Sequence, residues 1–218
     1  MTITQTLAVW ALPVLFAVTL HEVAHGWVAR ALGDPTAARL GRLSLNPMNH
    51  VDPVGTLLLP GLMLVARAFG MGGFLFGWAK PVPVDWHNFK NPRRDMAIVA
   101  AAGPLANLAM AIAWAVIFKF AAGTGVDEGV WYGIRKMGEA GIVINLSLMV
   151  LNLLPLPPLD GGRVLLGVLP AKAAYRVSQI EPYGMVILIL LLATGILGVL
   201  LSAPYLLVLN FVRHIVGI

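Results

Sequence analysis

The sequence contains no cysteine. This absence excludes disulfide bonds, thiolate nucleophiles and cysteine-ligated zinc sites, so any bound metal must be held by histidine, aspartate or glutamate. Charged residues are also scarce, at 11% of the 218 residues, whereas soluble domains carry about 25%. This scarcity indicates a membrane protein or a protein with an unusual core. The basic residues are scattered between apolar segments, so we expect no nucleic-acid partner.

Hydrophobic residues make up 59% of the chain and form long runs. Residues 1–20, 97–118 and 182–212 contain no charged side chain, and a membrane-spanning helix needs about 20 such residues. The runs lack the two-residue alternation of a membrane β-barrel. The sequence therefore predicts an all-α polytopic membrane protein, embedded in the lipid bilayer, with five or six transmembrane helices. The expected helices are 5–32, 96–121, 140–154, about 183–201 and 204–217.

Broken segments separate these predicted helices. The segment 36–53 is polar, turn-rich and partly strand-like, and 70–95 is rich in glycine and proline. For these two segments we expect short extended stretches at the membrane interface. The apolar segment 54–69 is short and is interrupted by a Pro-Gly pair, which favours a re-entrant or interfacial segment over a span. Residues 122–139 are expected to form a loop.

The first predicted helix carries the sequence HEVAH at residues 21–25. Positions i and i+4 lie on one face of a helix, so the imidazoles of His21 and His25 can bind the same metal ion. Glu22 lies beside that face, where its carboxylate can take a proton from a metal-activated water and give it to a leaving amine. Each ionisable group in a membrane helix costs about 2.5 kcal/mol or more. Three such groups so close together therefore indicate a metal site.

A catalytic zinc ion takes three protein ligands and keeps one position open, so a third ligand is needed. Most of the remaining acids lie in polar loops. Asp160 differs, because it lies in NLLPLPPLDGGR, where three prolines and two glycines interrupt an apolar run. Irregular backbone at membrane depth is tolerated only where it lines a cavity or is buried in protein, which makes Asp160 the preferred ligand. Asp52 and His50 remain alternatives, although a turn or interface role is favoured for His50.

The motifs HEVAH and NLLPLPPLDGGR together resemble those of the site-2 protease family of intramembrane zinc metalloproteases. The stretches AAGPLAN, GRLSLNP, HVDPVGT and GWAKPVPV are similar to the short bacterial branch of that family, without a PDZ domain. The resemblance extends from about residue 20 to residue 163. It implies roles for five residues: the zinc ligands His21, His25 and Asp160, the general base Glu22, and Asn152 as a helper at the oxyanion.

The same resemblance implies the activity. The chain is expected to be a zinc metalloendopeptidase with one Zn²⁺ ion, which hydrolyses peptide bonds within or next to the transmembrane segments of membrane-protein substrates. Residues 1–218 would form a single membrane-embedded domain, with a catalytic core of about 5–170 and C-terminal helices of about 183–217. Extended backbone within 70–90 is expected to pair with an unwound substrate strand by β-addition.

Two features have other interpretations. A membrane metal-ion transporter is the alternative function, because intramembrane histidine and aspartate also mark ion pathways. A transporter has no required role for Glu22, and the sequence contains no inverted repeat of the motif, so the protease is favoured. Asn107 in AAGPLAN is interpreted as a contact between helices, since intramembrane asparagine commonly joins helices.

Helix direction predicts the orientation in the membrane. His21 and His25 lie near the C-terminal end of their helix, and Asp160 follows the helix 140–154. If these ends meet away from the bilayer centre, the two helices run in the same direction, which requires 54–69 to re-enter. Eleven basic residues then lie on one side, which is therefore cytoplasmic, and three lie on the other side: Lys119, Arg135 and Lys136. We expect a multi-pass cell-membrane protein with its active site nearer the cytoplasm.

Overall fold

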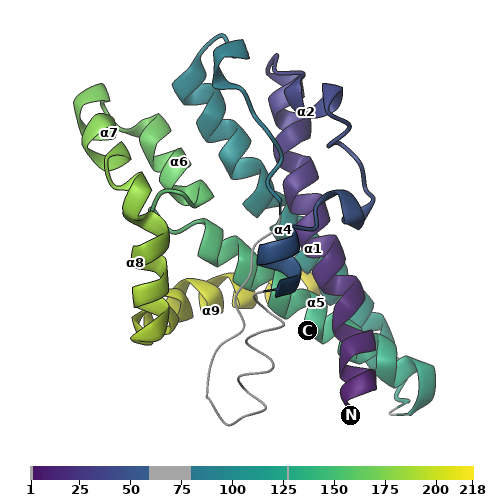
Figure 1. Ribbon diagram of the computed structural model, residues 1–218. Helices are drawn as coiled ribbons and strands as arrows, with labels where there is room; N and C mark the ends of the chain where they lie inside the picture. The colour runs from purple at the N-terminus through teal and green to yellow at the C-terminus, as the bar shows by residue number, and fades with distance from the viewer. Residues whose placement is uncertain (1, 59–79, 127) are drawn as a thin grey trace.

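The computed structural model describes residues 2–58, 80–126 and 128–218, and helices dominate this part of the chain (Figure 1). Short helical turns occur at Pro47–Asn49 (η1), Pro53–Leu58 (η2) and Trp86–Asn88 (η3). No strand occurs within the described ranges, so the predicted all-α class is confirmed. The α-helices are α1 (Ile3–Ala31), α2 (Thr36–Arg39), α4 (Pro92–Gly123), α5 (Gly129–Asn152), α6 (Asp160–Val168), α7 (Ala171–Ser178), α8 (Glu181–Ala193) and α9 (Ile196–Val216).

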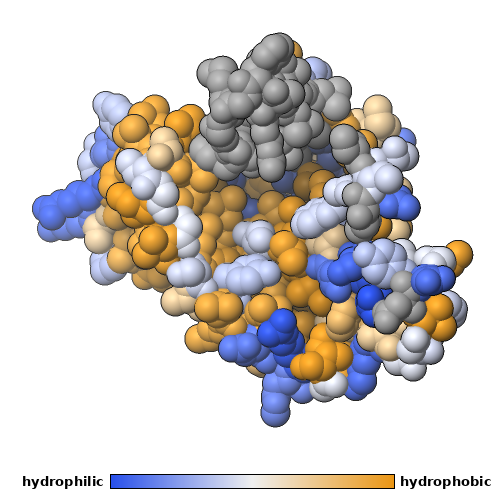
Figure 2. All heavy atoms as spheres, turned by 90° about the horizontal axis from the view of Figure 1, so that it is seen from below, coloured by the Kyte–Doolittle hydropathy of each residue, from blue (hydrophilic) through white to orange (hydrophobic). Residues whose placement is uncertain are grey.

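Three of the described helices, α1, α4 and α9, are long and apolar enough to cross a membrane. The pair α7 and α8, bent by 60° at the break between them, raises this to four if the pair is one span. Helix α5 falls outside the set because its first half carries Arg135, Lys136 and Glu139. Apolar residues cover much of the face seen in Figure 2, with hydrophilic residues mostly at its margins. The count of five or six spans stays a prediction.

Two predicted boundaries between helices are wrong. The final break lies at Thr194 and Gly195, whereas Pro204 is inside α9. Gly195 adopts φ +75°, a conformation that glycine accepts without strain, so the chain turns there. The predicted loop 122–139 is also shorter, because α5 already begins at Gly129. In its first turns Lys136 forms an ion pair with Glu139 at 2.7 Å, three residues further along the same helix.

The predicted broken segments are partly corrected. Residues 36–53 contain no strand and instead form α2 and the turn η1. Within the predicted 70–95 stretch, residues 80–85 are irregular backbone without helix, but α4 already begins at Pro92. Residues 59–79 lie outside the described residues, and most of the predicted re-entrant segment 54–69 falls on them.

Helix α4 packs against α1 and α5, which also contact each other, and it runs antiparallel to both (Figure 1). Close contacts pair Gly138 of α5 with Phe118 of α4, and Gly141 with Trp114. The later residue of α5 contacts the earlier residue of α4, as it must when two helices are antiparallel. Glycine at such positions lets the backbones approach closely. Since α1 is antiparallel to α4 as well, α1 and α5 run in the same direction, as predicted.

The loop after α1 is joined to the segment before α4 by the fully buried carboxylate of Asp34. One carboxylate oxygen accepts hydrogen bonds from the backbone N–H and hydroxyl of Thr36 and from the Asn88 amide at 2.8 Å. The other accepts the backbone N–H of Asp85 at 2.8 Å. Burial raises the pKa of the Asp34 carboxyl, but these hydrogen bonds outweigh it and hold the pKa below its usual range. Residues 85–88 are thereby fixed beside the C-terminal end of α1.

A second link joins the two chain segments that flank residues 51–79. The backbone N–H of Lys80 donates to the carbonyl oxygen of His50 at 2.9 Å. The guanidinium of Arg42 donates to the carbonyl oxygen of Lys80, also at 2.9 Å. His50 and Lys80 are therefore direct neighbours in the structure.

Candidate metal centre

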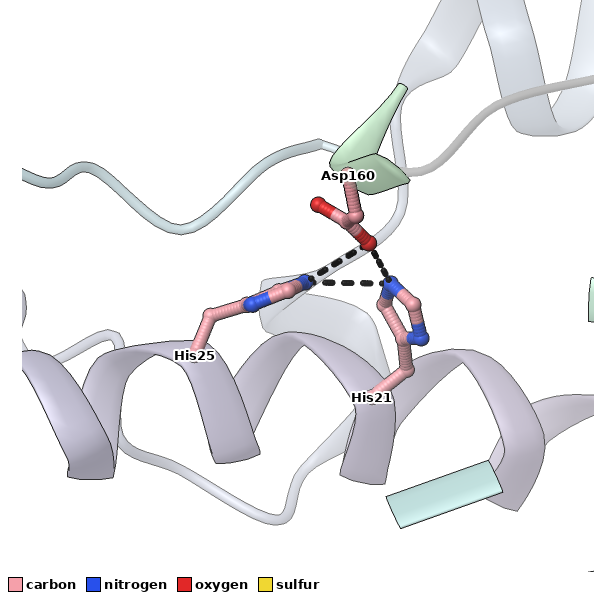
Figure 3. A group of neighbouring side chains, drawn as sticks. All are labelled: His21, His25 and Asp160. Atoms are coloured by element: carbon pink, nitrogen blue, oxygen red, sulfur yellow. Dashed lines mark hydrogen bonds and ion pairs between the residues drawn. The ribbon is translucent and has the colours of Figure 1, made fainter. Parts of the chain in front are cut away.

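Helix α1 places His21 and His25 on one face, and both side chains are buried, with 7% and 9% exposure. Asp160, the first residue of α6, approaches them from a different part of the chain (Figure 3). His21 Nε2 lies 3.2 Å and His25 Nε2 3.3 Å from Asp160 Oδ2, and the two Nε2 atoms are 3.1 Å apart. The structure therefore brings together the three residues that the sequence predicted as metal ligands.

Hydrogen bonds on the far side of each imidazole define which atoms face the centre. His21 Nδ1–H donates to Asn107 Oδ1 at 2.6 Å, and His25 Nδ1–H donates to the carbonyl oxygen of Val99 at 2.7 Å. Both partners can only accept, so the proton of each neutral ring is on Nδ1 and each Nε2 presents a lone pair. Asp160 Oδ2 is buried and accepts no hydrogen bond of normal geometry from any described residue. With both rings neutral, three electron-rich atoms converge without a proton between them, which favours a cation at their centre.

The spacing of these atoms fits zinc. In a tetrahedral site with bonds of about 2.0 Å, neighbouring ligand atoms lie about 3.3 Å apart. The three observed separations, 3.1 to 3.3 Å, agree with that value. Nitrogen and oxygen ligands suit Zn²⁺, and three protein ligands leave the fourth position open, as in catalytic rather than structural sites.

Gly103 of the AAGPLAN sequence lets α4 pass in direct contact with the imidazole rings of His21 and His25. A Cβ atom at Gly103 would lie 2.4 Å from His25 Nε2 and 2.6 Å from His21 Cε1, far inside van der Waals contact. The imidazoles would have to move to accommodate any side chain there. Gly103 is therefore required for the observed position of the ligand atoms.

The loop that carries Asp160 is held by its own glycines and by α8. A Cβ atom at Gly161 would lie 2.3 Å from the carbonyl oxygen of Leu153, and one at Gly162 would lie 2.3 Å from the backbone nitrogen of Pro157. Helix α8 approaches the same loop at Gly184, where a Cβ atom would meet the carbonyl oxygen of Pro157. Helix α8 therefore packs directly against the segment that precedes Asp160.

Glu22 lies next to the ligand cluster and is not part of it. Its Oε2 accepts the backbone N–H of Val82 at 2.8 Å, from the segment 80–85. The carboxylate is partly exposed, unlike the two buried histidines. This arrangement fits a base that must reach a water molecule rather than a metal ligand.

The other predicted candidates lie outside the cluster. The Asn152 side-chain amide donates to the carbonyl oxygen of Leu148 at 3.0 Å, within α5. His50 is buried and its Nε2 contacts the carbonyl oxygen of Ser44 at 2.9 Å, in keeping with the favoured turn role. Asp52 accepts two backbone N–H groups at the start of the turn η2. The oxyanion role of Asn152 stays a prediction.

Sequence reasoning missed three polar contacts. Asn107 does join helices, as interpreted, but it also holds His21. Asn145 was not singled out, although an amide within an apolar helix was the available signal. The hydrogen bond between Val82 and Glu22 had no local signal, because 60 residues separate the partners.

Comparisons with known proteins agree with this geometry. The model of the family "Peptidase family M50" matches residues 132–194. A Bacillus subtilis protein named "Putative zinc metalloprotease YwhC" is 39% identical over 178 residues, which cover 81% of this chain and 76% of that protein. The chain belongs to peptidase family M50.

Other relatives of this M50 protein carry similar names. "Putative zinc metalloprotease Rip2" of Mycolicibacterium smegmatis is 31% identical over 185 residues, covering 84% of this chain and 66% of that protein. No solved structure matches the chain significantly. The predicted resemblance to the site-2 protease family is confirmed, and this M50 chain is a zinc metalloprotease.

Proposed function

We propose that this chain is an intramembrane zinc protease that hydrolyses peptide bonds within or next to the transmembrane segments of membrane proteins. The observation that carries the proposal is the convergence of His21, His25 and Asp160 on one point. Both histidines lie in a helix long and apolar enough to cross a membrane. A hydrolytic centre in such a helix acts on peptide bonds that reach the membrane.

In this proposal one zinc ion is held by His21, His25 and Asp160. Bound zinc supplies Lewis acidity, which polarises the scissile carbonyl and makes water a nucleophile near neutral pH. The Glu22 carboxylate takes the proton of the attacking water and passes it to the leaving amine. The N–H of Val82 donates a hydrogen bond to Oε2 of Glu22, and the other carboxylate oxygen of Glu22 is the one that accepts the proton of the water.

A helical substrate hides its amides in intrahelical hydrogen bonds, so the scissile segment must unwind before cleavage. We propose that the unwound strand pairs with extended backbone of this chain. Within residues 80–84, Pro81 and Pro83 have no N–H, and the N–H of Val82 is taken by Glu22. The carbonyl oxygens of Lys80 and Pro81 accept hydrogen bonds from the Arg42 guanidinium, so pairing along this part of the chain is left to the remaining backbone groups of residues 82–84.

Asn152 is the proposed helper at the oxyanion. One of its two amide hydrogens is donated to the carbonyl oxygen of Leu148, which leaves the second hydrogen to donate to substrate. An amide that gains this bond only as negative charge develops would contribute to the transition state rather than to substrate binding.

We propose that the centre lies nearer the cytoplasmic side of the cell membrane. The loop after α1 and the segment before α4 are joined through Asp34, and both carry basic residues. Short loops rich in lysine and arginine remain in the cytoplasm. The hydrogen bond between the Lys80 N–H and the His50 carbonyl supports placing the segment before α4 on the same side as the loop after α1, because a single crossing would separate these two residues by the bilayer thickness.

The transporter alternative has no support from the comparisons, since the relatives carry the name "Putative zinc metalloprotease". Substitution of Glu22 separates the two functions directly. A transporter does not need this carboxylate, whereas a protease loses its proton carrier.

The test uses purified full-length protein in detergent with a model transmembrane substrate. Glu22→Gln should keep about one zinc ion per chain and lose cleavage by about 10²- to 10⁴-fold, the usual contribution of a general base. Glu128→Gln, at an exposed position outside the site, is the matched control and should leave cleavage unchanged. Cleavage at the wild-type rate by Glu22→Gln would contradict the proposed mechanism.

A further inference from the structure

Two buried asparagines connect the three central helices behind the metal centre. Asn107 of α4 and Asn145 of α5 are both completely buried. Asn107 Oδ1 accepts the Nδ1–H of His21 at 2.6 Å, and its Nδ2 donates to Asn145 Oδ1 at 3.0 Å. Asn145 Nδ2 in turn donates to the carbonyl oxygen of Gly141 at 2.8 Å. A continuous chain of hydrogen bonds thus runs from the α5 backbone to a zinc ligand.

Backbone carbonyls, which can only accept, fix the donor-to-acceptor direction of this series of hydrogen bonds. The Gly141 carbonyl holds the amide nitrogen of Asn145 and so turns Asn145 Oδ1 towards Asn107. The carbonyl oxygen of Ala17 accepts the second hydrogen of Asn107 Nδ2 at 3.1 Å. A flipped Asn107 amide would place its oxygen against two acceptors. Asn107 Oδ1 is therefore held towards His21.

The two histidines differ in how they are held. His25 Nδ1–H donates to the backbone carbonyl of Val99, which every amino acid at that position provides. His21 Nδ1–H depends on a side chain, and that side chain depends on a second one. Loss of the acceptor would leave a buried N–H without a partner and would free the ring to rotate or change tautomer.

We propose that Asn107 and Asn145 are positioning residues that hold the His21 ring with Nε2 directed at the zinc site. The inference rests on the proposed function, because it concerns a ligand of the same zinc ion. The competing explanation is a purely structural one, in which the two amides only join α1, α4 and α5. The two explanations differ in what they predict for zinc affinity.

The experiment measures the zinc dissociation constant of purified full-length protein by competition with a chromogenic chelator. Asn107→Leu removes every hydrogen bond of the amide and should weaken zinc binding by about 10- to 100-fold, as for other partners of metal-binding histidines. Asn107→Asp removes the donors to Ala17 and Asn145 and keeps an acceptor for His21. It should therefore bind zinc more tightly than Asn107→Leu.

Gly138→Ala is the matched control for loosened helix packing. It introduces a Cβ atom 2.8 Å from Phe118 Cβ at the contact between α4 and α5, away from the asparagines. Thermal unfolding of the metal-free protein should detect this loss of packing, while the zinc dissociation constant stays at the wild-type value. Asn145→Leu should shift the dissociation constant in the same direction as Asn107→Leu, by a smaller factor.

Two results would overturn the inference. The first is equal weakening in Asn107→Leu and Asn107→Asp, which would assign the effect to the lost helix contacts. The second is a weakening of zinc binding in Gly138→Ala as large as that in Asn107→Leu. Failure of the wild-type protein to bind zinc would instead contradict the proposed function, so the two failures are distinguishable.

Discussion

The backbone N–H of Val82 donates to Oε2 of Glu22 at 2.8 Å, from a segment 60 residues further along the chain. Val82 lies between Pro81 and Pro83, which have no N–H, so it supplies the one donor available there. The hydrogen bond restricts rotation of the Glu22 carboxylate. It also ties the position of the proposed base to the segment that Asp34 fixes beside α1.

Val82→Pro removes this N–H and should lower cleavage of a model substrate by about 10- to 100-fold, since a hydrogen bond to a charged group contributes about 1.5–3 kcal/mol. Zinc content should not change. Val82→Ala is the control, because it keeps the N–H and loses only the contact of the Val82 side chain with α1 near Gly26. Equal activity of Val82→Pro and Val82→Ala would show that the hydrogen bond does not contribute.

The ligand assignment predicts metal content. Wild-type protein should hold about one zinc ion per chain, and His21→Ala or Asp160→Ala should lose most of it, because two ligands bind zinc far more weakly than three. Elemental analysis of purified protein measures the ratio. Asp52→Ala, at the alternative acid, should keep its zinc. If Asp160→Ala kept its zinc and Asp52→Ala lost it, the third ligand would be Asp52 rather than Asp160.

Gly103→Ala should prevent zinc binding although it changes no ligand. The added Cβ atom would lie 2.4 Å from His25 Nε2, so the imidazoles must leave their observed positions. Gly123→Ala makes the same change in the same helix where no atom lies within 4 Å, and it should bind zinc normally. Normal zinc content in Gly103→Ala would mean that α4 can move away from the histidines at little cost.

Cysteine labelling tests the orientation, because the chain has no native cysteine. The exposed positions Leu40, Lys90 and Glu128 are suitable, since none of them takes part in the Asp34 network. In intact cells a membrane-impermeant thiol reagent should label Glu128→Cys and should not label Leu40→Cys or Lys90→Cys. Labelling of Lys90→Cys without Leu40→Cys would instead make 54–69 a membrane span.

Local rules were sufficient to single out the three residues that converge at the candidate site. The spacing of His21 and His25 defines one helix face, and the broken backbone around Asp160 singles that acid out among the others. The common direction of α1 and α5 also followed from the sequence, because the ligands had to meet. These features depend on the geometry of single helices and on the cost of charge in a membrane.

Side-chain contacts between segments far apart in the sequence could not be predicted. Asn107 meets His21 across 86 residues and Asn145 across 38, and neither pairing follows from local pattern. The final helix break was misplaced because Pro204 in the sequence SAP was taken as the interruption and Gly195 was given no weight. Proline is tolerated within α9, whereas glycine alone takes the left-handed turn without strain.

The contact between Gly184 and Pro157 has a consequence for biosynthesis. The ribosome makes the N-terminal part first, so both histidines are present in α1 well before Asp160 is translated. The loop that carries Asp160 does not meet its support from α8 until Gly184 has been added. The three residues of the cluster can therefore converge only after most of the chain has been made, and the helix that packs against the Asp160 segment is added later still.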